Sequence, residues 1–310
     1  MSEKTELQKK FEELFNKWRG QQENEPGYDY KRNGIAKGSF TIDGIVHEEC
    51  WNGLAKKRKN KVLYILREAN GNASEMGPEG KEVDDGDFWF QKCVTGKETK
   101  VTDNIFQRIK EMQIIIQKYG SEAKPDKEIL SEVAYMNLNK RGGGASVDWK
   151  IFNDYIEKYK EYIKEEIAII KPDIIVCCGT YWPLVDNILG LYKGEKGPNW
   201  ESEDKKDFDY DDAIINDEKG KEPHKARIIN MYHPSARISK ENYIERFEGI
   251  YSVPTNASAK NNSESLVLSK EKICEIVNKM DEHTEEFCEL CDLINNIKES
   301  LEKKKMEADK

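Results

Sequence analysis

Three polar side chains that could do chemistry lie in or directly after apolar runs of the chain. Glu68 follows VLYIL, Asn137 lies within VAYMNL, and His233 follows ARIINMY. A carboxylate can orient water, and an imidazole can donate a hydrogen bond to a group that gains negative charge. A carboxamide carries both donors and an acceptor. The three types together predict acid–base or electrostatic catalysis, provided that the fold brings them to one cavity.

The apolar runs that must position these side chains have the length and composition of strands. They span residues 62–66, 133–138, 173–178 and 226–232. They are continuous rather than alternating, which is typical of strands buried on both faces of a parallel sheet. Helical patterns lie between them, so the chain predicts an α/β three-layer sandwich with a central four-stranded parallel sheet. In such folds ligands bind beyond the carboxyl ends of the strands.

Helices are predicted between the strands and at both ends of the chain. Residues 103–119 begin at an aspartate cap, and residues 148–170 form a long amphipathic stretch that ends before Lys171-Pro172. A third helix is expected from Pro183 to about Leu191.

The pattern divides the chain into four parts. We expect an N-terminal helical segment (1–59) packed on the core and an α/β domain (60–250) with an acidic surface insertion (192–224). A linker (251–265) then leads to a C-terminal amphipathic helix (266–310). This helix is expected to dock on the domain, or to pair with a protein partner or a second copy.

Composition sets limits on partners and location. The formal net charge of −9 disfavours a protein that coats nucleic acid, although basic runs such as KKRKNK (56–61) allow a basic mouth on an acidic body. No segment resembles a signal peptide or reaches membrane-spanning length, so no membrane partner is expected. Seven cysteines without a secreted-domain framework predict reduced thiols and a cytoplasmic protein.

The order of motifs in the chain resembles that of the uracil-DNA glycosylase superfamily, over roughly residues 60–250. REANG (67–71) is similar to the turn after the first strand, and YMNLNK (135–140) carries the asparagine of the second strand. IKPDIIVCCG (170–179) is similar to the third strand, and His-Pro-Ser (233–235) is the last motif.

The resemblance implies a hydrolase, namely a DNA glycosylase that removes uracil or another altered base from DNA. Cleavage of an N-glycosidic bond passes through a sugar cation and a departing base anion. His233 is expected to stabilise the anion, Glu68 to orient water or stabilise the cation, and Asn137 to read the edge of an extruded base.

The resemblance also places further contacts. An aromatic residue after the first motif should stack on the base; among Phe88, Trp89 and Phe90 we favour Phe88, and Asn70 is expected beside it in the base pocket. The expected contacts to the DNA backbone are Ser235, Arg237 and Lys140.

Departures from the family pattern leave other functions open. Arg67, Ala69 and Asn70 replace the usual residues of the first motif, which puts uracil specificity and catalysis in question. The alternatives are a non-catalytic module of the same fold that binds nucleic acid or protein, and an N-glycosidase that acts on free nucleosides or nucleotides. In the simplest structural interpretations, Glu68 forms an ion pair with Arg67 and His233 is a turn residue.

No metal, cluster or other cofactor is expected. A zinc site can be imagined from Cys274, His283, Cys288 and Cys291, but their helical spacing along an apolar seam favours buried thiols. Cys178 with His233 is the pair to test for thiol chemistry.

Overall fold

The computed structural model describes residues 3–25, 40–70, 89–95, 104–119, 124–143, 147–191, 210–215 and 224–252. The chain forms two compact units, Met1–Thr255 and Asn256–Lys310, and all described residues belong to the first. The predicted C-terminal helix and the four residues of the imagined zinc site therefore lie outside the described residues, as does most of the predicted linker. Within the described residues, no helix has the length and apolar character needed to cross a membrane.

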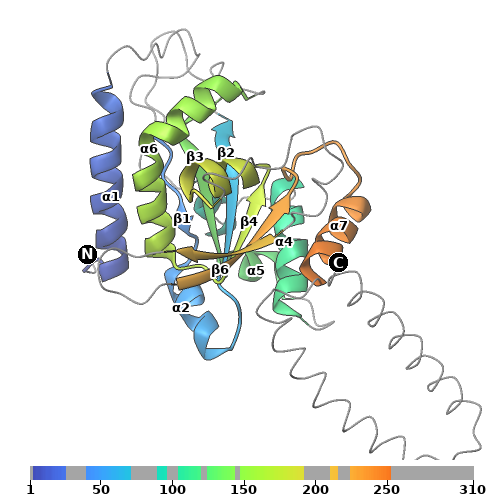
Figure 1. The fold of residues 1–310 in the computed structure, drawn as a ribbon. Helices are drawn as coiled ribbons and strands as arrows, with labels where there is room; N and C mark the ends of the chain where they lie inside the picture. Colours follow the sequence, from blue (N-terminus) through green and yellow to red (C-terminus); the bar gives the residue numbers. More distant parts are fainter. Residues whose placement is uncertain are drawn as a thin grey trace, which may run out of the picture. The chain divides into compact units, whose positions relative to one another are not determined.

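A mostly parallel sheet forms the centre of the first unit (Figure 1). Its strand order is β1-β3-β2-β4-β6-β5. The strands are β1 (Gly44–Ile45), β2 (Val62–Asn70), β3 (Val133–Gly143), β4 (Ile174–Cys178), β5 (Tyr210–Ile215) and β6 (His224–Met231). The four apolar runs of the sequence are β2, β3, β4 and β6, and they pair in parallel as predicted.

The prediction of four strands was wrong about the edges of the sheet. The two-residue β1 pairs antiparallel with β3, and β5 pairs antiparallel with β6, so the sheet has six strands, five of them longer than two residues. Because β5 lies inside the predicted acidic insertion, that insertion is partly a strand of the sheet rather than only a surface loop.

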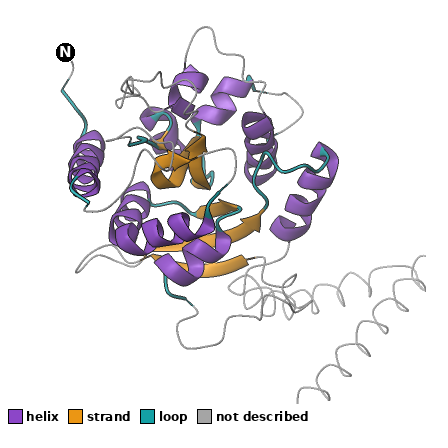
Figure 2. Cartoon of the chain, turned by 90° about the horizontal axis from the view of Figure 1, so that it is seen from above, coloured by secondary structure: helices purple, strands orange, loops and turns teal. Residues whose placement is uncertain are grey.

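Helices cover both faces of the sheet, which gives the α/β layering (Figure 2). One face packs on α1 (Glu6–Glu23), α2 (Glu48–Lys56), α6 (Trp149–Ile170) and the π-helix η1 (Pro183–Ile188). The other packs on α3 (Trp89–Thr95), α4 (Asn104–Gln117), α5 (Asp126–Ser131) and α7 (Lys240–Ser252). The first two residues of the predicted linker are therefore the last two of α7.

Local signals explain where the helices begin and end. The Asp148 carboxylate accepts hydrogen bonds from the backbone amides of Lys150 (3.0 Å) and Ile151 (3.1 Å), which starts α6 as predicted. Lys171 adopts a left-handed conformation (φ 51°) before Pro172 and ends the helix. The predicted third helix is the shorter η1, in which bonds span five residues.

The N-terminal helix α1 is part of the core. Thr5 and Gln8 form a reciprocal capping box at its start, with both hydrogen bonds at 3.1 Å. Its buried face presents Leu14, Phe15 and Trp18 to the sheet and α6. These apolar side chains hold α1 in the domain.

Candidate active site

The carboxyl ends of β2 and β3 meet at Glu68 and Asn139, which are paired in register. The Asn139 amide nitrogen donates to the Glu68 carboxylate at 2.9 Å, and its Oδ1 accepts from the Arg141 backbone N–H at 3.0 Å. Burial raises the pKa of Glu68, while the hydrogen bond from Asn139 and the charge of Arg67 oppose that shift. The carboxylate is therefore partly desolvated and fixed in orientation, as a water-orienting group requires.

The ends of β4 and β6 are joined through Gly179. Its N–H donates to the Met231 carbonyl at 2.7 Å, and its φ of +75° is one that a glycine adopts at little cost. A Cβ built on Gly179 would lie 3.6 Å from the His233 Cβ, so the two residues are in close contact. This turn fixes the start of the His-Pro-Ser loop against the end of β4.

His233 is held as one neutral tautomer. The Ser235 backbone N–H donates to the His233 Nδ1 at 3.2 Å, and the Ser235 hydroxyl oxygen lies 2.7 Å from the same nitrogen. Because Nδ1 accepts a hydrogen bond, the proton of the neutral ring is on Nε2. His233 thus offers an N–H donor, and the phosphate contact predicted for Ser235 would have to displace its hydroxyl from this bond.

The surroundings of His233 keep it uncharged at neutral pH. Burial lowers its pKa to about 4, and the positive charges of Arg67 and Arg108 act in the same direction. Arg67 also acts on the pKa of Glu68, so one cation lies within electrostatic reach of both predicted catalytic groups. Arg67 also contacts the Trp149 ring, whose centroid is 5.8 Å from its guanidinium carbon.

We predict that His233 makes folding stability depend on pH. Its pKa is about 4 in the folded protein and about 6.5 in an unfolded chain. Between these values the unfolded state binds the extra proton, so stability is lost as the pH falls from 6.5 towards 4. The glutamine side chain of His233→Gln does not titrate. Glu68 is present in both proteins, so its contribution to the pH dependence of stability cancels in the comparison.

Urea unfolding at pH 7 and at about pH 4.5 checks this prediction. The wild-type protein should lose about 1–2 kcal/mol more than His233→Gln, less than the full shift implies because the ring is partly exposed. Equal losses in the two proteins would contradict it.

Arg108 holds the His-Pro-Ser loop, and the sequence analysis missed it. From α4, its guanidinium donates to the backbone carbonyls of Pro234 (2.7 Å), Ala236 (3.1 Å) and Ile238 (2.5 Å). Arg108 is 5% exposed and lies over the Tyr243 ring at 4.4 Å. A usable signal was present, because a helix places residues 108, 112 and 116 on one face and the last two are apolar.

Replacing Arg108 should loosen this loop. We expect Arg108→Ala to lower the free energy of unfolding by about 3 kcal/mol, because three carbonyls lose a charged donor, and Arg108→Lys by about half as much. Urea denaturation measures both. Lys240→Ala, which breaks an exposed ion pair between α7 and Glu111 of α4, is the control and should cost under about 1 kcal/mol. A cost for Arg108→Ala no larger than for the control would show that the hydrogen bonds of Arg108 add nothing to stability.

Asn137 lies two residues deeper in the sheet than Asn139 and pairs in register with Leu66. Its side chain is 2% exposed, and its Oδ1 has no hydrogen-bond partner among the residues that the structure describes. Its backbone N–H donates to the Asp43 carboxylate at 2.6 Å. Side chains two apart on a strand share a face, so Asn137 lies on the same side of β3 as Asn139. A buried acceptor without a donor is costly unless a ligand supplies one.

The prediction that Lys140 contacts DNA was wrong. Lys140 is fully buried, paired with Asp43 and, at 2.9 Å, with Glu166 of α6. Its ammonium also lies over the rings of Phe15 (5.6 Å) and Trp18 (5.3 Å). Alternation along β3 turns Lys140 to the same side as residues 134, 136 and 138, which are apolar and buried, so its direction was readable from the sequence.

The other predicted site residues have different outcomes. Phe88 lies outside the described residues, as does the side chain of Asn70. Phe90 is buried and stacks on Tyr135 at 4.5 Å, so it belongs to the core. Arg237 is exposed, as a contact with the DNA backbone requires.

Thiol chemistry between Cys178 and His233 is not supported. Cys178 is fully buried, and burial raises the pKa of its thiol far above the usual range. The nucleophilic thiolate therefore does not form near neutral pH. Within the described residues, no group of three or more His, Cys, Asp or Glu side chains is arranged to hold a metal ion.

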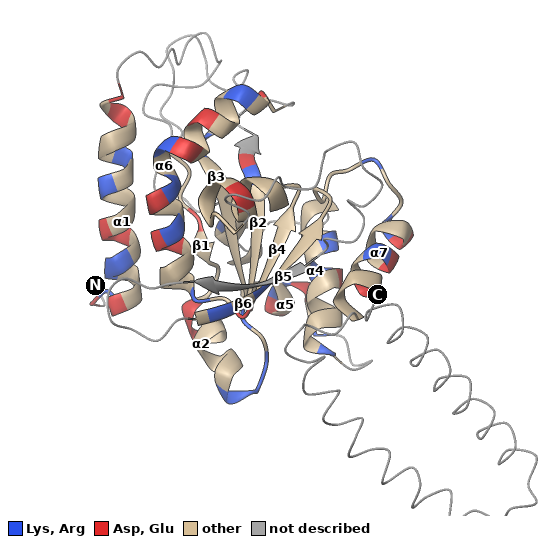
Figure 3. Cartoon of the chain, viewed as in Figure 1, with Lys and Arg blue, Asp and Glu red and all other residues tan. Residues whose placement is uncertain are grey.

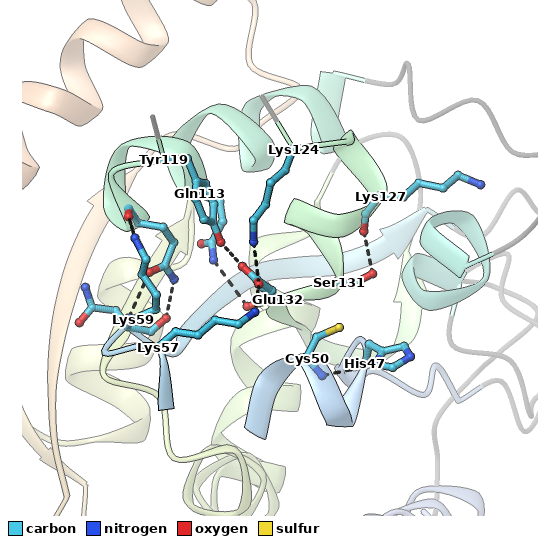
Figure 4. Close-up of polar contacts among 12 residues, drawn as sticks. His47, Cys50, Lys57, Lys59, Gln113, Tyr119, Lys124, Lys127, Ser131 and Glu132 are labelled. Carbon is cyan, nitrogen blue, oxygen red and sulfur yellow. Dashed lines mark hydrogen bonds and ion pairs between the residues drawn. The ribbon is translucent and has the colours of Figure 1, made fainter. Parts of the chain in front are cut away.

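The basic run 56–61 does not contribute to a basic mouth. It lies at the end of α2 and before β2, at the amino ends of the parallel strands (Figure 3). Glu68 and His233 lie at the opposite, carboxyl ends of β2 and β6. There Lys57 and Lys124 each lie 3.1 Å from the carboxylate of Glu132 (Figure 4). Arg67 and Arg108 supply positive charge near the candidate site, because both act on the pKa of His233.

This arrangement combines an oriented carboxylate, a neutral imidazole N–H donor and a buried amide acceptor around the carboxyl ends of β2, β3 and β6. No protein-family model matches the chain, and a search of curated proteins gives no significant match. The likeness to the uracil-DNA glycosylase superfamily therefore rests on the sequence motifs.

Proposed function

We propose that the protein hydrolyses the N-glycosidic bond of uracil or another altered base in DNA, with a uracil-DNA glycosylase-like fold. The observation that carries the proposal is the position of Glu68 and His233. Glu68 lies near the carboxyl end of β2 and His233 follows the carboxyl end of β6, and Arg67 influences the pKa of each. Ligands of open α/β sheets bind at the carboxyl ends of the strands.

The two groups have opposite tasks in the proposed reaction. As the glycosidic bond breaks, negative charge grows on the base, and the N–H at Nε2 of His233 stabilises it by hydrogen bonding. A neutral donor suits this step because it is ready at physiological pH without an added proton. Glu68, in its ionised form, orients the water that attacks the sugar and stabilises the positive charge that develops there.

Recognition of the base is assigned to Asn137. Its unpartnered Oδ1 is an acceptor for an N–H group on the base edge, and its amide nitrogen is a donor for a carbonyl. An extruded base presents such an edge once it has left the helix stack. The proposal thus gives a ligand to a polar atom that is otherwise buried without one.

A base-release screen tests the proposed function. Single strands and duplexes that carry uracil or other altered bases are incubated with the full chain, and abasic sites are detected by alkaline cleavage. His233→Ala serves as the matched variant, and free nucleotides are included as substrates. Release that depends on His233 supports the proposal. Release only from free nucleotides would favour a nucleotide N-glycosidase, and DNA binding without any release would favour a non-catalytic module.

A further inference from the structure

Large apolar side chains are rarely exposed in the described part of the chain, and two of the exceptions adjoin the candidate site. The exposed large hydrophobic residues are Trp149 (49%), Leu191 (42%) and Tyr232 (50%). Tyr232 directly precedes His233, and Trp149 lies against Arg67, the neighbour of Glu68. Both rings are therefore accessible to a binding partner beside the polar site.

The Trp149 ring is held in its exposed position. Its edge meets the buried Phe152 ring at 5.7 Å with an interplanar angle of 90°, one turn along α6. The Arg67 guanidinium lies 5.8 Å from the centre of the indole. The indole is therefore a positioned platform with a cation beside it, rather than a side chain that has failed to reach the core.

Tyr232, next to His233, is also positioned by an arginine and by neighbouring contacts. The guanidinium of Arg246 lies 4.9 Å from the centre of its ring. Its backbone carbonyl accepts a hydrogen bond from the Tyr243 hydroxyl at 2.8 Å, which fixes the residue at the end of β6. Each of these two exposed rings is thus paired with an arginine.

The order of the strands sets how far apart Glu68 and His233 lie. The strands β2 and β6 are separated by β4, which places their ends about 10 Å apart. Glu68 and His233 lie at these two ends, with Trp149 against Arg67, the neighbour of Glu68, and Tyr232 next to His233. Exposed aromatics interleaved with cations are the feature by which proteins bind unpaired nucleic acid, because bases stack on the rings and phosphates meet the cations.

We infer that the substrate is unpaired DNA, and that nucleotides beside the target base stack on Trp149 and Tyr232. This inference rests on the proposed function and deepens it by naming the substrate class. A duplex keeps its bases stacked on one another, so it cannot use both platforms without local opening. The nucleobase faces of a single strand are open to both rings.

Binding of unreactive DNA tests the inference without relying on catalysis. Fluorescence anisotropy is measured with labelled oligothymidylate and with a hairpin duplex of the same length, using the full chain. We expect Trp149→Ala and Tyr232→Ala each to weaken binding of the single strand about tenfold, and Trp149→Phe to retain most of it. Leu191→Ala is the control, because it removes an exposed apolar side chain of comparable exposure that is not part of either platform.

The binding experiment distinguishes failure of the inference from failure of the proposed function. Wild-type affinity in both alanine variants, equal losses for strand and duplex, or no single-strand binding by the wild-type chain would overturn the stacking platforms. Thermal unfolding of the variants excludes a loss of fold. A chain that binds single strands through the two rings but releases no base would keep the inference about unpaired DNA and refute the glycosylase activity.

Discussion

Glu68→Gln should reduce base release from a susceptible oligonucleotide by about 10²- to 10⁴-fold, because an amide cannot carry the negative charge that orients water and balances the sugar cation. Folding should be retained, since the glutamine carbonyl can still accept the hydrogen bond from Asn139. The pH profile gives a second readout. Because burial raises the pKa of Glu68, the wild-type rate should rise with pH through that pKa, and the variant should lack this rise.

Single-turnover measurements of released base, over a range of pH, check this prediction. Glu161→Gln is the matched control, because Glu161 is an exposed glutamate of α6 paired with Lys164 at 2.8 Å. An undiminished rate in Glu68→Gln would remove the carboxylate from the mechanism.

Lys140→Met should lower the free energy of unfolding by about 3–5 kcal/mol. The substitution preserves much of the volume but leaves Asp43 and Glu166 buried beside one another without their cation. Burial already raises the pKa of Glu166, and loss of Lys140 would raise it further. The variant should therefore be least stable at high pH, where Glu166 must ionise in the interior beside Asp43.

Urea denaturation at two pH values measures this effect. Adding Glu166→Gln to Lys140→Met should restore part of the lost stability, because one buried charge is removed. Lys164→Met, on the exposed side of α6, is the control and should cost under about 1 kcal/mol. A cost for Lys140→Met as small as the control's would mean that the buried cluster contributes little.

The parts of the fold that the sequence predicted are those with a continuous apolar pattern. The strands β2, β3, β4 and β6 were recognisable because both of their faces are buried. The edge strands were not, since β1 has two residues and β5 is embedded among aspartates. A short or charged edge strand lacks the apolar content on which such predictions depend.

The sequence likewise predicted some residues of the candidate site but not others. Glu68 and His233 were predicted because polar residues directly after buried strands converge at one edge. The roles of Arg108, Asn139 and Lys140 depend on contacts with residues 71 to 130 positions away in the chain. The two-residue repeat of a strand and the 3.6-residue repeat of a helix give the direction in which such a side chain points. Its partner can be identified only from the tertiary structure.

The antiparallel strand β5 has a consequence for the acidic insertion. Its six residues pair with residues 224–229, which are six of the eight residues of β6, so it shields most of the backbone N–H and C=O groups of β6 on that side. Excising the insertion would turn a buried, apolar strand into an open border of the sheet, which is a template for association between molecules. Although the composition of the acidic insertion is typical of a dispensable surface loop, its strand β5 thus protects β6 from pairing with another molecule.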